Sequence, residues 1–157
     1  KGVLVEPNVE LVNVIKSKRP NDICINAGVG KEEGEKAFYT FKRNTRNTFS
    51  EKEAAAWSKQ SGQIAKIEKR AVLPLDEIIN EHFRSAPPNI VSIDTEGYEI
   101  EILSGLSWEK KPEVFCIEIL ASSGTDTGRT NVFEVLSSHG YGLLAQTPTN
   151  AIFVLSR

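Results

Sequence analysis

The stretch IVSIDTEGYEIEILSG, residues 90–105, decides the fold of this chain. Its first part, Ile90–Asp94, predicts a strand whose core residues are Ile90, Val91 and Ile93. Its second part predicts a helix over Tyr98–Leu106. Two acids, Asp94 and Glu96, stand between the strand and the helix. This junction places carboxylates at the carboxyl end of a strand, where α/β proteins bind their ligands.

Strands and helices alternate along the rest of the chain. Apolar runs predict strands at Gly2–Val5, Asp22–Ala27, Glu35–Phe41 and Val114–Ile119. Helical spacing predicts helices at Asn8–Lys18, Glu51–Lys59, Leu75–Phe83 and Asn131–His139. The remaining segments predict a strand pair or extended insert at Gln63–Val72, a loop at Ser122–Arg129, and a terminal hairpin of Tyr141–Gln146 and Ala151–Leu155. This order predicts an α/β fold with a mostly parallel sheet and a C-terminal antiparallel hairpin.

The composition is that of one globular domain. The chain has 157 residues, a formal charge of −2 and 39% hydrophobic residues, so we expect one domain over residues 1–157 with an insert at about 35–72. The near-neutral charge argues against a nucleic-acid binder. No apolar run approaches the ~18 residues of a membrane span. The first residues lack the layout of a secretion signal, so a cytoplasmic location is expected.

Acids lie at or near the carboxyl ends of three predicted strands. Glu6 can bind both hydroxyls of a ribose, or it can interact with the dipole of the helix that follows it. Asp94 and Glu96 can orient or deprotonate a substrate hydroxyl or hold a metal, or they are acids at a helix start. Glu118 interrupts an apolar strand, which predicts either a functional role or a structural ion pair. Glu99 is expected on the solvated side of its helix.

The glycines near residue 30 do not form a dinucleotide fingerprint. Gly28, Gly30 and Gly34 have the spacing G-x-G-x-x-x-G, one residue longer than the fingerprint. The charged segment that follows has no apolar helical face. We therefore interpret Gly28-Val29-Gly30 as a turn.

The central motif resembles that of the FkbM-type methyltransferase family. The family signature is a strand ending in I-D-x-E-G-x-E and an apolar helix ending in L-x-G, and residues 93–105 follow it. Weaker matches occur in the same order at Val5-Glu6-Pro7-Asn8, Asn26-Ala27-Gly28-Val29-Gly30, Leu73-Pro74-Leu75-Asp76-Glu77-Ile78, Cys116-Ile117-Glu118-Ile119 and His139-Gly140-Tyr141. The resemblance therefore covers nearly the whole chain.

This resemblance implies a class I, Rossmann-like three-layer sandwich and an enzyme that uses S-adenosylmethionine to methylate a hydroxyl of a sugar or natural product. By position, Glu6 would bind the cofactor ribose and Ala27 would begin the loop beside the adenine. Asp94 and Glu96 would be the catalytic acids, and Asp94 would also line the cofactor cleft. Glu118 would lie near the substrate at the floor of the cleft. No metal is implied, the acceptor would be a small molecule or glycan, and a homo-oligomer remains open.

Two features depart from the family pattern. Ser92 stands where the family often has Lys. The chain also begins at the family's second strand, so relative to that pattern it is N-terminally truncated and lacks the first strand and its glycine loop. In the family's strand order, 3-2-1-4-5-7-6, strand 1 is central, so strands 2 and 4 are expected to have unpaired edges. A longer polypeptide, another segment or a second chain would fill the gap.

Two other function classes suit the same α/β layout. A nicotinamide-dependent oxidoreductase of Rossmann type would also use Glu6, but it needs the glycine fingerprint that is absent here. A methyltransferase-like fold could also serve as a non-catalytic binding module, in which Asp94 and Glu96 would be dispensable.

Overall fold

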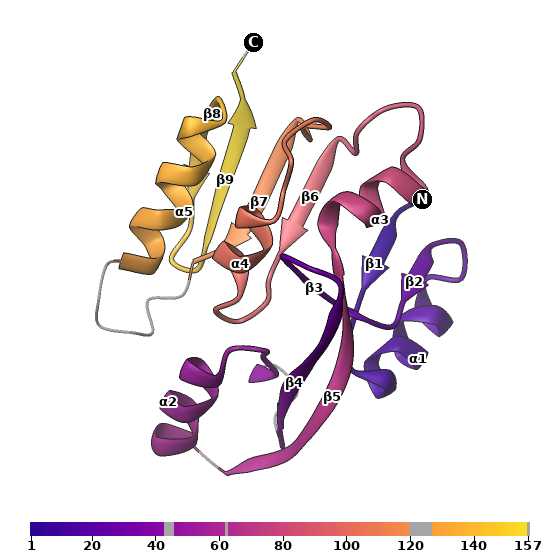
Figure 1. The fold of residues 1–157 in the computed structure, drawn as a ribbon, viewed down its shortest axis with the longest axis vertical. Coiled ribbons are helices and arrows are strands. Elements are labelled where there is room, and N and C mark those ends of the chain that lie inside the picture. The colour runs from indigo at the N-terminus through magenta and orange to yellow at the C-terminus, as the bar shows by residue number, and fades with distance from the viewer. Residues whose placement is uncertain (43–45, 62, 120–126, 157) are drawn as a thin grey trace.

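A computed structural model describes residues 1–42, 46–61, 63–119 and 127–156 (Figure 1). The strands are β1 (Val3–Val5), β2 (Ile23–Ile25), β3 (Gly28–Gly30), β4 (Gly34–Phe41), β5 (Ile64–Pro74), β6 (Ile90–Ile93), β7 (Val114–Glu118), β8 (Tyr141–Gln146) and β9 (Asn150–Leu155). The helices are α1 (Val9–Lys18), α2 (Glu51–Ser61), α3 (Leu75–His82), α4 (Glu99–Ser104) and α5 (Thr127–Ser138). Most of the predicted loop at Ser122–Arg129 lies outside the described residues.

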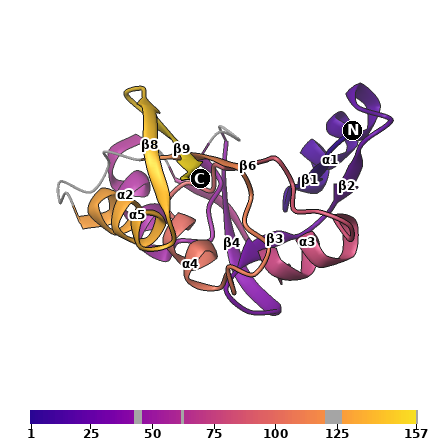
Figure 2. The same ribbon diagram turned by 90° about the horizontal axis from the view of Figure 1, so that it is seen from above.

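A four-stranded sheet with the order β6-β7-β9-β8 contains the main core. Helices α4 and α5 cover one face of this sheet (Figures 1 and 2). Phe115 and Ile117 of β7 are fully buried, as are Leu103 of α4 and Leu136 of α5. Alternating residues of β7 thus point into the apolar layer beneath the helices, which anchors the carboxyl end of the strand.

The α/β class and the C-terminal hairpin are confirmed, but the mostly parallel sheet is not. Pairs β1–β2, β3–β5 and β6–β7 are parallel, whereas β4–β5, β7–β9 and β8–β9 are antiparallel. Two of the three sheets are therefore mixed. The physical reason is that β5 folds back along β4 as a long ribbon and that the terminal hairpin inserts β9 between β7 and β8.

The segment Gly28-Val29-Gly30 is a strand, so its interpretation as a turn is wrong. It forms β3 and pairs in parallel with β5 in the sheet β3-β5-β4, with Gly30 opposite Pro74. Gly30 can pack here because it has no side chain. A Cβ on Gly30 would lie 2.7 Å from Val72 Cγ1 and 3.4 Å from Tyr98 Cε1. The glycine spacing reflects close packing in a sheet.

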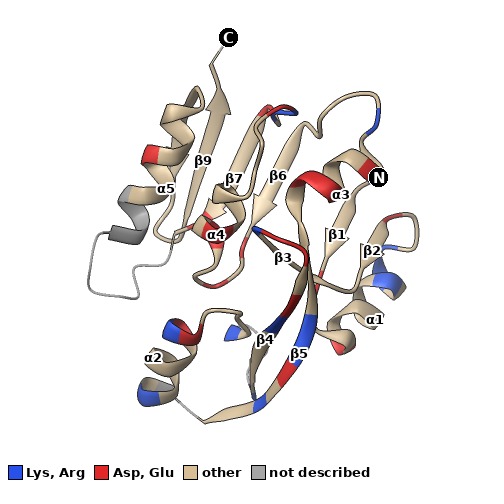
Figure 3. Cartoon of the chain, in the orientation of Figure 1, with Lys and Arg blue, Asp and Glu red and all other residues tan. Residues whose placement is uncertain are grey.

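Helix α2 packs against the far end of the β4–β5 ribbon. Ala54 and Trp57 are buried against Phe41, and the rings of Trp57 and Phe41 lie 6.0 Å apart in an edge-on arrangement. Charged residues of both signs lie along β4 and β5 (Figure 3). The ribbon therefore has its own small apolar cluster at the end that α2 covers.

Strands β1 and β6 have edges that pair with no other strand among the described residues. β1 pairs with β2, and β6 pairs with β7. Between β1 and β6 lies a groove of about 400 Å³, lined by both strands and by Ile78 and Ile79 of α3. The unpaired edges expected for the family's second and fourth strands are thus present (Figure 2).

The described helices include none with the length and apolar character needed to cross a membrane.

We expect Gly30→Ala to destabilise the fold by about 1–3 kcal/mol, because the added methyl group would overlap the buried side chain of Val72. Gly34→Ala is the matched control, since a Cβ there meets nothing within 4 Å. Urea unfolding followed by tryptophan fluorescence measures both. Equal stability of the two variants would show that β3 does not pack against β5 in this way.

Candidate functional site

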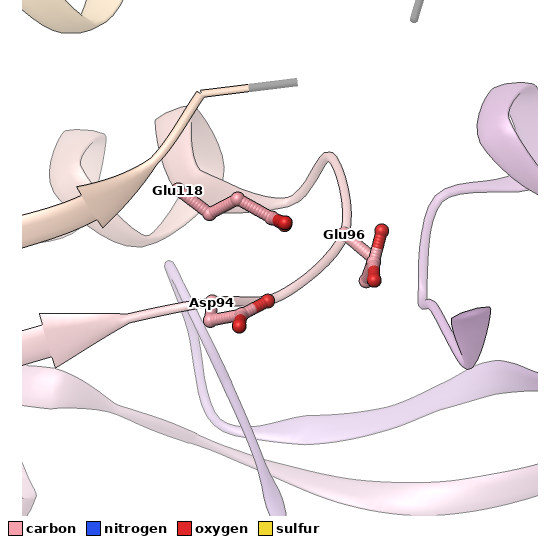
Figure 4. Close-up of side chains that lie close together, drawn as sticks. All are labelled: Asp94, Glu96 and Glu118. Carbon is pink, nitrogen blue, oxygen red and sulfur yellow. The ribbon is translucent and has the colours of Figure 1, made fainter. Parts of the chain in front are cut away.

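Three carboxyl groups meet at the carboxyl ends of β6 and β7. The parallel register pairs Ile93 with Ile117, so Asp94, which follows β6, lies beside Glu118, the last residue of β7. Glu96 follows two residues after Asp94, and one oxygen from each of the three carboxyls lies within 4.8 Å of the others. Figure 4 shows the three side chains close together, with Asp94 and Glu118 extending toward the loop that carries Glu96. We call Asp94, Glu96 and Glu118 the acid trio.

The backbone between β6 and α4 makes a tight turn. We call residues 94–97 the acid loop. Glu96 has φ 56° and Gly97 has φ 93°, so both lie in the left-handed region. Gly97 adopts this conformation readily, whereas a residue with a Cβ is disfavoured by roughly 1–2 kcal/mol. The conformation of Glu96 therefore has to be held by its surroundings.

Glu99 holds the acid loop from the side of α4, and the expectation that it is solvated is wrong. Its side chain is buried, with 7% exposed. Glu99 Oε1 accepts hydrogen bonds from the backbone N–H of Thr95 at 3.1 Å, the Thr95 hydroxyl at 2.9 Å and the Gly97 N–H at 3.1 Å. The buried carboxylate is retained because these loop donors replace water.

Thr48 contacts the acid loop from the opposite side. Its hydroxyl donates to the carbonyl oxygen of Glu96 at 2.8 Å, and its side chain is 1% exposed. No local sequence pattern marks Thr48 as a site residue, since the bond joins residues 48 positions apart. Sequence reasoning assigned this region only to an insert.

The acid trio is electrostatically unfavourable in its ionised form. Burial, followed by the charges of Asp94 and Glu99, raises the pKa of Glu96 to about 7, and the cation of Arg46 only partly opposes this. Burial, then the neighbouring charges of Glu96 and Asp94, raises the pKa of Glu118 to about 8. Near neutral pH both groups are thus poised between their protonated and ionised forms.

Glu118 is not part of a structural ion pair among the described residues. Its Oε2 atom is buried and receives no hydrogen bond from them. A structural role through pairing and a functional role both stay predictions for this acid. A buried carboxyl oxygen that has no partner is free to bind a ligand group.

A pocket of about 550 Å³ joins the acid trio to the other predicted site residues. Glu6 and Ala27 line it together with Asp94, Glu96 and Glu118. The charged residues in the described lining are all acids, so this wall suits neutral or cationic groups. Phe38 of β4 and two residues of the segment after β4, Thr48 and Phe49, also line this pocket.

Glu6 is oriented by the start of α1. Its Oε1 accepts the N–H of Asn8 at 2.8 Å, while Asn8 caps the helix through a bond from the Glu10 N–H to its Oδ1 at 2.9 Å. Burial raises the pKa of Glu6, and the Asn8 bond partly opposes this shift. The carboxyl group is thus held at the pocket wall, at the end of β1, as the sequence predicts.

The carboxyl oxygens of the acid trio are also close enough to ligate one cation. Acidic groups gather without a metal in many proteins, so we assign no metal ligand. The absence of a metal site stays a prediction.

The site as a whole can bind hydroxyl and cationic groups and can exchange a proton near neutral pH. An α/β chain with carboxylates at the ends of parallel strands is typical of enzymes that bind a nucleoside-bearing cofactor. The profile of the methyltransferase FkbM domain matches residues 1–143. The chain therefore belongs to the FkbM methyltransferase family, which confirms the resemblance seen in residues 93–105 and suggests methyltransferase activity. No curated protein and no solved structure gives a significant match.

We expect Glu118→Gln to stabilise the fold increasingly as the pH rises. A carboxyl whose pKa is raised in the folded state contributes stability at low pH and loses it as the pH rises through the folded value, here about 8. The melting temperature of the variant relative to the unsubstituted chain should therefore increase between pH 5 and pH 9, by roughly 3 °C or more. Glu10→Gln, an exposed acid outside the pocket, is the control. A difference that stays constant with pH would contradict this electrostatic picture.

Proposed function

We propose that this domain transfers a methyl group from S-adenosylmethionine to a hydroxyl oxygen of a sugar or another natural product. The observation that carries the proposal is that Glu6, Ala27 and the acid trio line a single pocket, although they come from separate parts of the sequence. The pocket volume of about 550 Å³ lies within the range of cofactor sites.

The residues present suit this cofactor in two respects. Glu6 supplies a half-buried carboxyl at the end of β1, where a ribose hydroxyl can be bound. The mutual repulsion that raises the pKa of Glu96 and Glu118 would be relieved by a positive charge in the pocket. When bound, S-adenosylmethionine would supply a methyl group on a positively charged sulfonium sulfur.

The acids of the pocket would act on the acceptor. A carboxylate within hydrogen-bond reach of a hydroxyl orients its oxygen, and it takes the hydroxyl proton as the new C–O bond forms. A base is most effective when its pKa lies near the working pH, and the pKa of Glu96 is about 7. This supports Glu96 in the proton role beside Asp94, with Glu118 at the floor of the pocket. Alignment of donor and acceptor would supply the rest of the catalysis.

The strand arrangement supports a Rossmann-like sandwich as the underlying fold. The pair β2–β1 and the sheet β6-β7-β9-β8 match the two flanks, 3-2 and 4-5-7-6, of the strand order that the family resemblance implies. In such a sheet the ligand lies at the carboxyl ends of the strands, where the order reverses. Asp94 and Glu6 stand on the two sides of that point.

Calorimetric titration with S-adenosylhomocysteine tests the cofactor, with NADH as the comparison ligand. We expect selective binding of S-adenosylhomocysteine. Glu6→Gln should weaken it about tenfold, because one charge-assisted hydrogen bond to the ribose is lost. Glu10→Gln, on the exposed face of α1, should bind normally.

Selective binding of NADH would establish the oxidoreductase alternative instead. If a folded sample binds neither ligand, a chain extended at its N-terminus is titrated in the same way. Failure of that chain would overturn the proposed cofactor.

Asp94→Asn or Glu96→Gln should lower the rate of methyl transfer at least about tenfold, which is a modest value for the loss of acid–base help. Transfer of a radiolabelled methyl group to a panel of sugars and hydroxylated natural products measures this. Full activity of both variants would contradict the proton role, and a retained binding function without any transfer would support the non-catalytic module.

A further inference from the structure

The acid loop is held between two groups of residues that are far apart in the sequence. Glu99 bonds to it from α4 through the Thr95 and Gly97 donors. Thr48, which pairs with Tyr39 of β4, bonds to it through the Glu96 carbonyl oxygen. The left-handed backbone of Glu96 lies between these two attachments.

Thr48 itself is rigidly placed. Its backbone N–H donates to the Tyr39 carbonyl at 3.1 Å, and the Tyr39 N–H donates to the Thr48 carbonyl at 2.9 Å. Its hydroxyl oxygen accepts the Ser50 N–H at 2.9 Å while donating its proton to Glu96. These hydrogen bonds therefore connect β4 to the acid loop through Thr48.

Close packing beside Thr48 leaves the loop little room to move. A Cβ on Gly97 would lie 2.5 Å from Glu53 Cγ of α2, and the Glu53 side chain is 6% exposed. The ring of Phe49 lies between Phe38, at 4.8 Å, and Tyr98, at 5.9 Å. The segment from Thr48 to Glu53 thus covers the loop, and Figure 4 shows Glu96 on the side that faces this segment.

We propose that Thr48 is a positioning residue for Glu96: by donating its hydroxyl to the Glu96 carbonyl, it fixes the left-handed turn that directs this carboxyl toward Asp94 and Glu118. The proposal deepens the proposed function, because it assigns control of the proton-accepting group to the unit of β4, α2 and β5. Without the bond, the backbone of Glu96 relaxes toward an ordinary conformation, and its carboxyl moves away from the other two.

The test uses Thr48→Val, which keeps the shape of the side chain and removes its donor, and Thr48→Ser, which keeps the hydroxyl. Carbon-13 NMR of the side-chain carboxyls reports the titration of Glu96 in the protein without any ligand. With Val, the titration midpoint should fall from about 7 toward the ordinary range of a glutamate, by roughly 1 or more, because the carboxyl leaves its acidic neighbours. With Ser, the midpoint should stay at its original value. Thr40→Val is the matched control, because Thr40 lies on the same ribbon and donates to the Lys66 carbonyl at 3.2 Å, away from the acid loop.

Two outcomes would overturn the proposal: an unchanged Glu96 titration in a folded Thr48→Val protein, or failure of Ser to preserve the midpoint. If Thr48→Val does not fold, the unsubstituted protein still decides. Slow exchange of the Thr48 hydroxyl proton with solvent is expected, because this proton is buried and donated to the Glu96 carbonyl, and fast exchange contradicts the contact. Titration of each variant with S-adenosylhomocysteine separates the two claims, since the cofactor can fail to bind while the effect on Glu96 persists.

Discussion

The parallel register of β6 and β7 is the constraint on which the site depends. Because Ile93 pairs with Ile117, the residue that follows β6, Asp94, is forced beside Glu118, the last residue of β7. Ile93 of β6 and Phe115 and Ile117 of β7 are buried in the core that α4 and α5 cover, so a shift of one residue would move these side chains out of it. The stability of the core thus enforces a cluster of like charges that would otherwise separate.

This clustering explains the chemistry of the pocket. Three carboxyls that share a half-buried space cannot all ionise easily, so protons remain on some of them near neutral pH. No Lys or Arg lines the described pocket wall, and the cation of Arg46 offsets the burial and charge around Glu96 only in part. A positively charged ligand would offset the negative charge of the acids. A hydroxyl group could donate to an ionised carboxyl or accept from a protonated one. These properties support the proposal of a cationic methyl donor and an alcohol acceptor.

The unit of β3, β4, α2 and β5 is more than an insertion at the edge of the fold. It supplies one wall of the pocket through Phe38 and Phe49, and it reaches the acid loop through Thr48. The loop also depends on Glu99, whose buried carboxylate collects three donors. Local strain at Glu96 is thereby balanced by contacts from two separate elements.

The sequence by itself determined the α/β class, the terminal hairpin, the family, and the placement of Glu6, Asp94 and Glu118 at strand ends. These follow from local patterns, namely apolar runs, helical spacing and a contiguous motif, which act over a few residues. Only the tertiary structure decided that Gly30 lies in a strand, that Glu99 is buried and that Thr48 bonds to Glu96. The positions of Gly30 and Thr48 depend on which distant residues pack beside them, and the burial of Glu99 depends on how the acid loop turns back over it. The spacing of residues along α4 cannot reveal that the acid loop covers Glu99, because the loop takes up this position only in the folded chain.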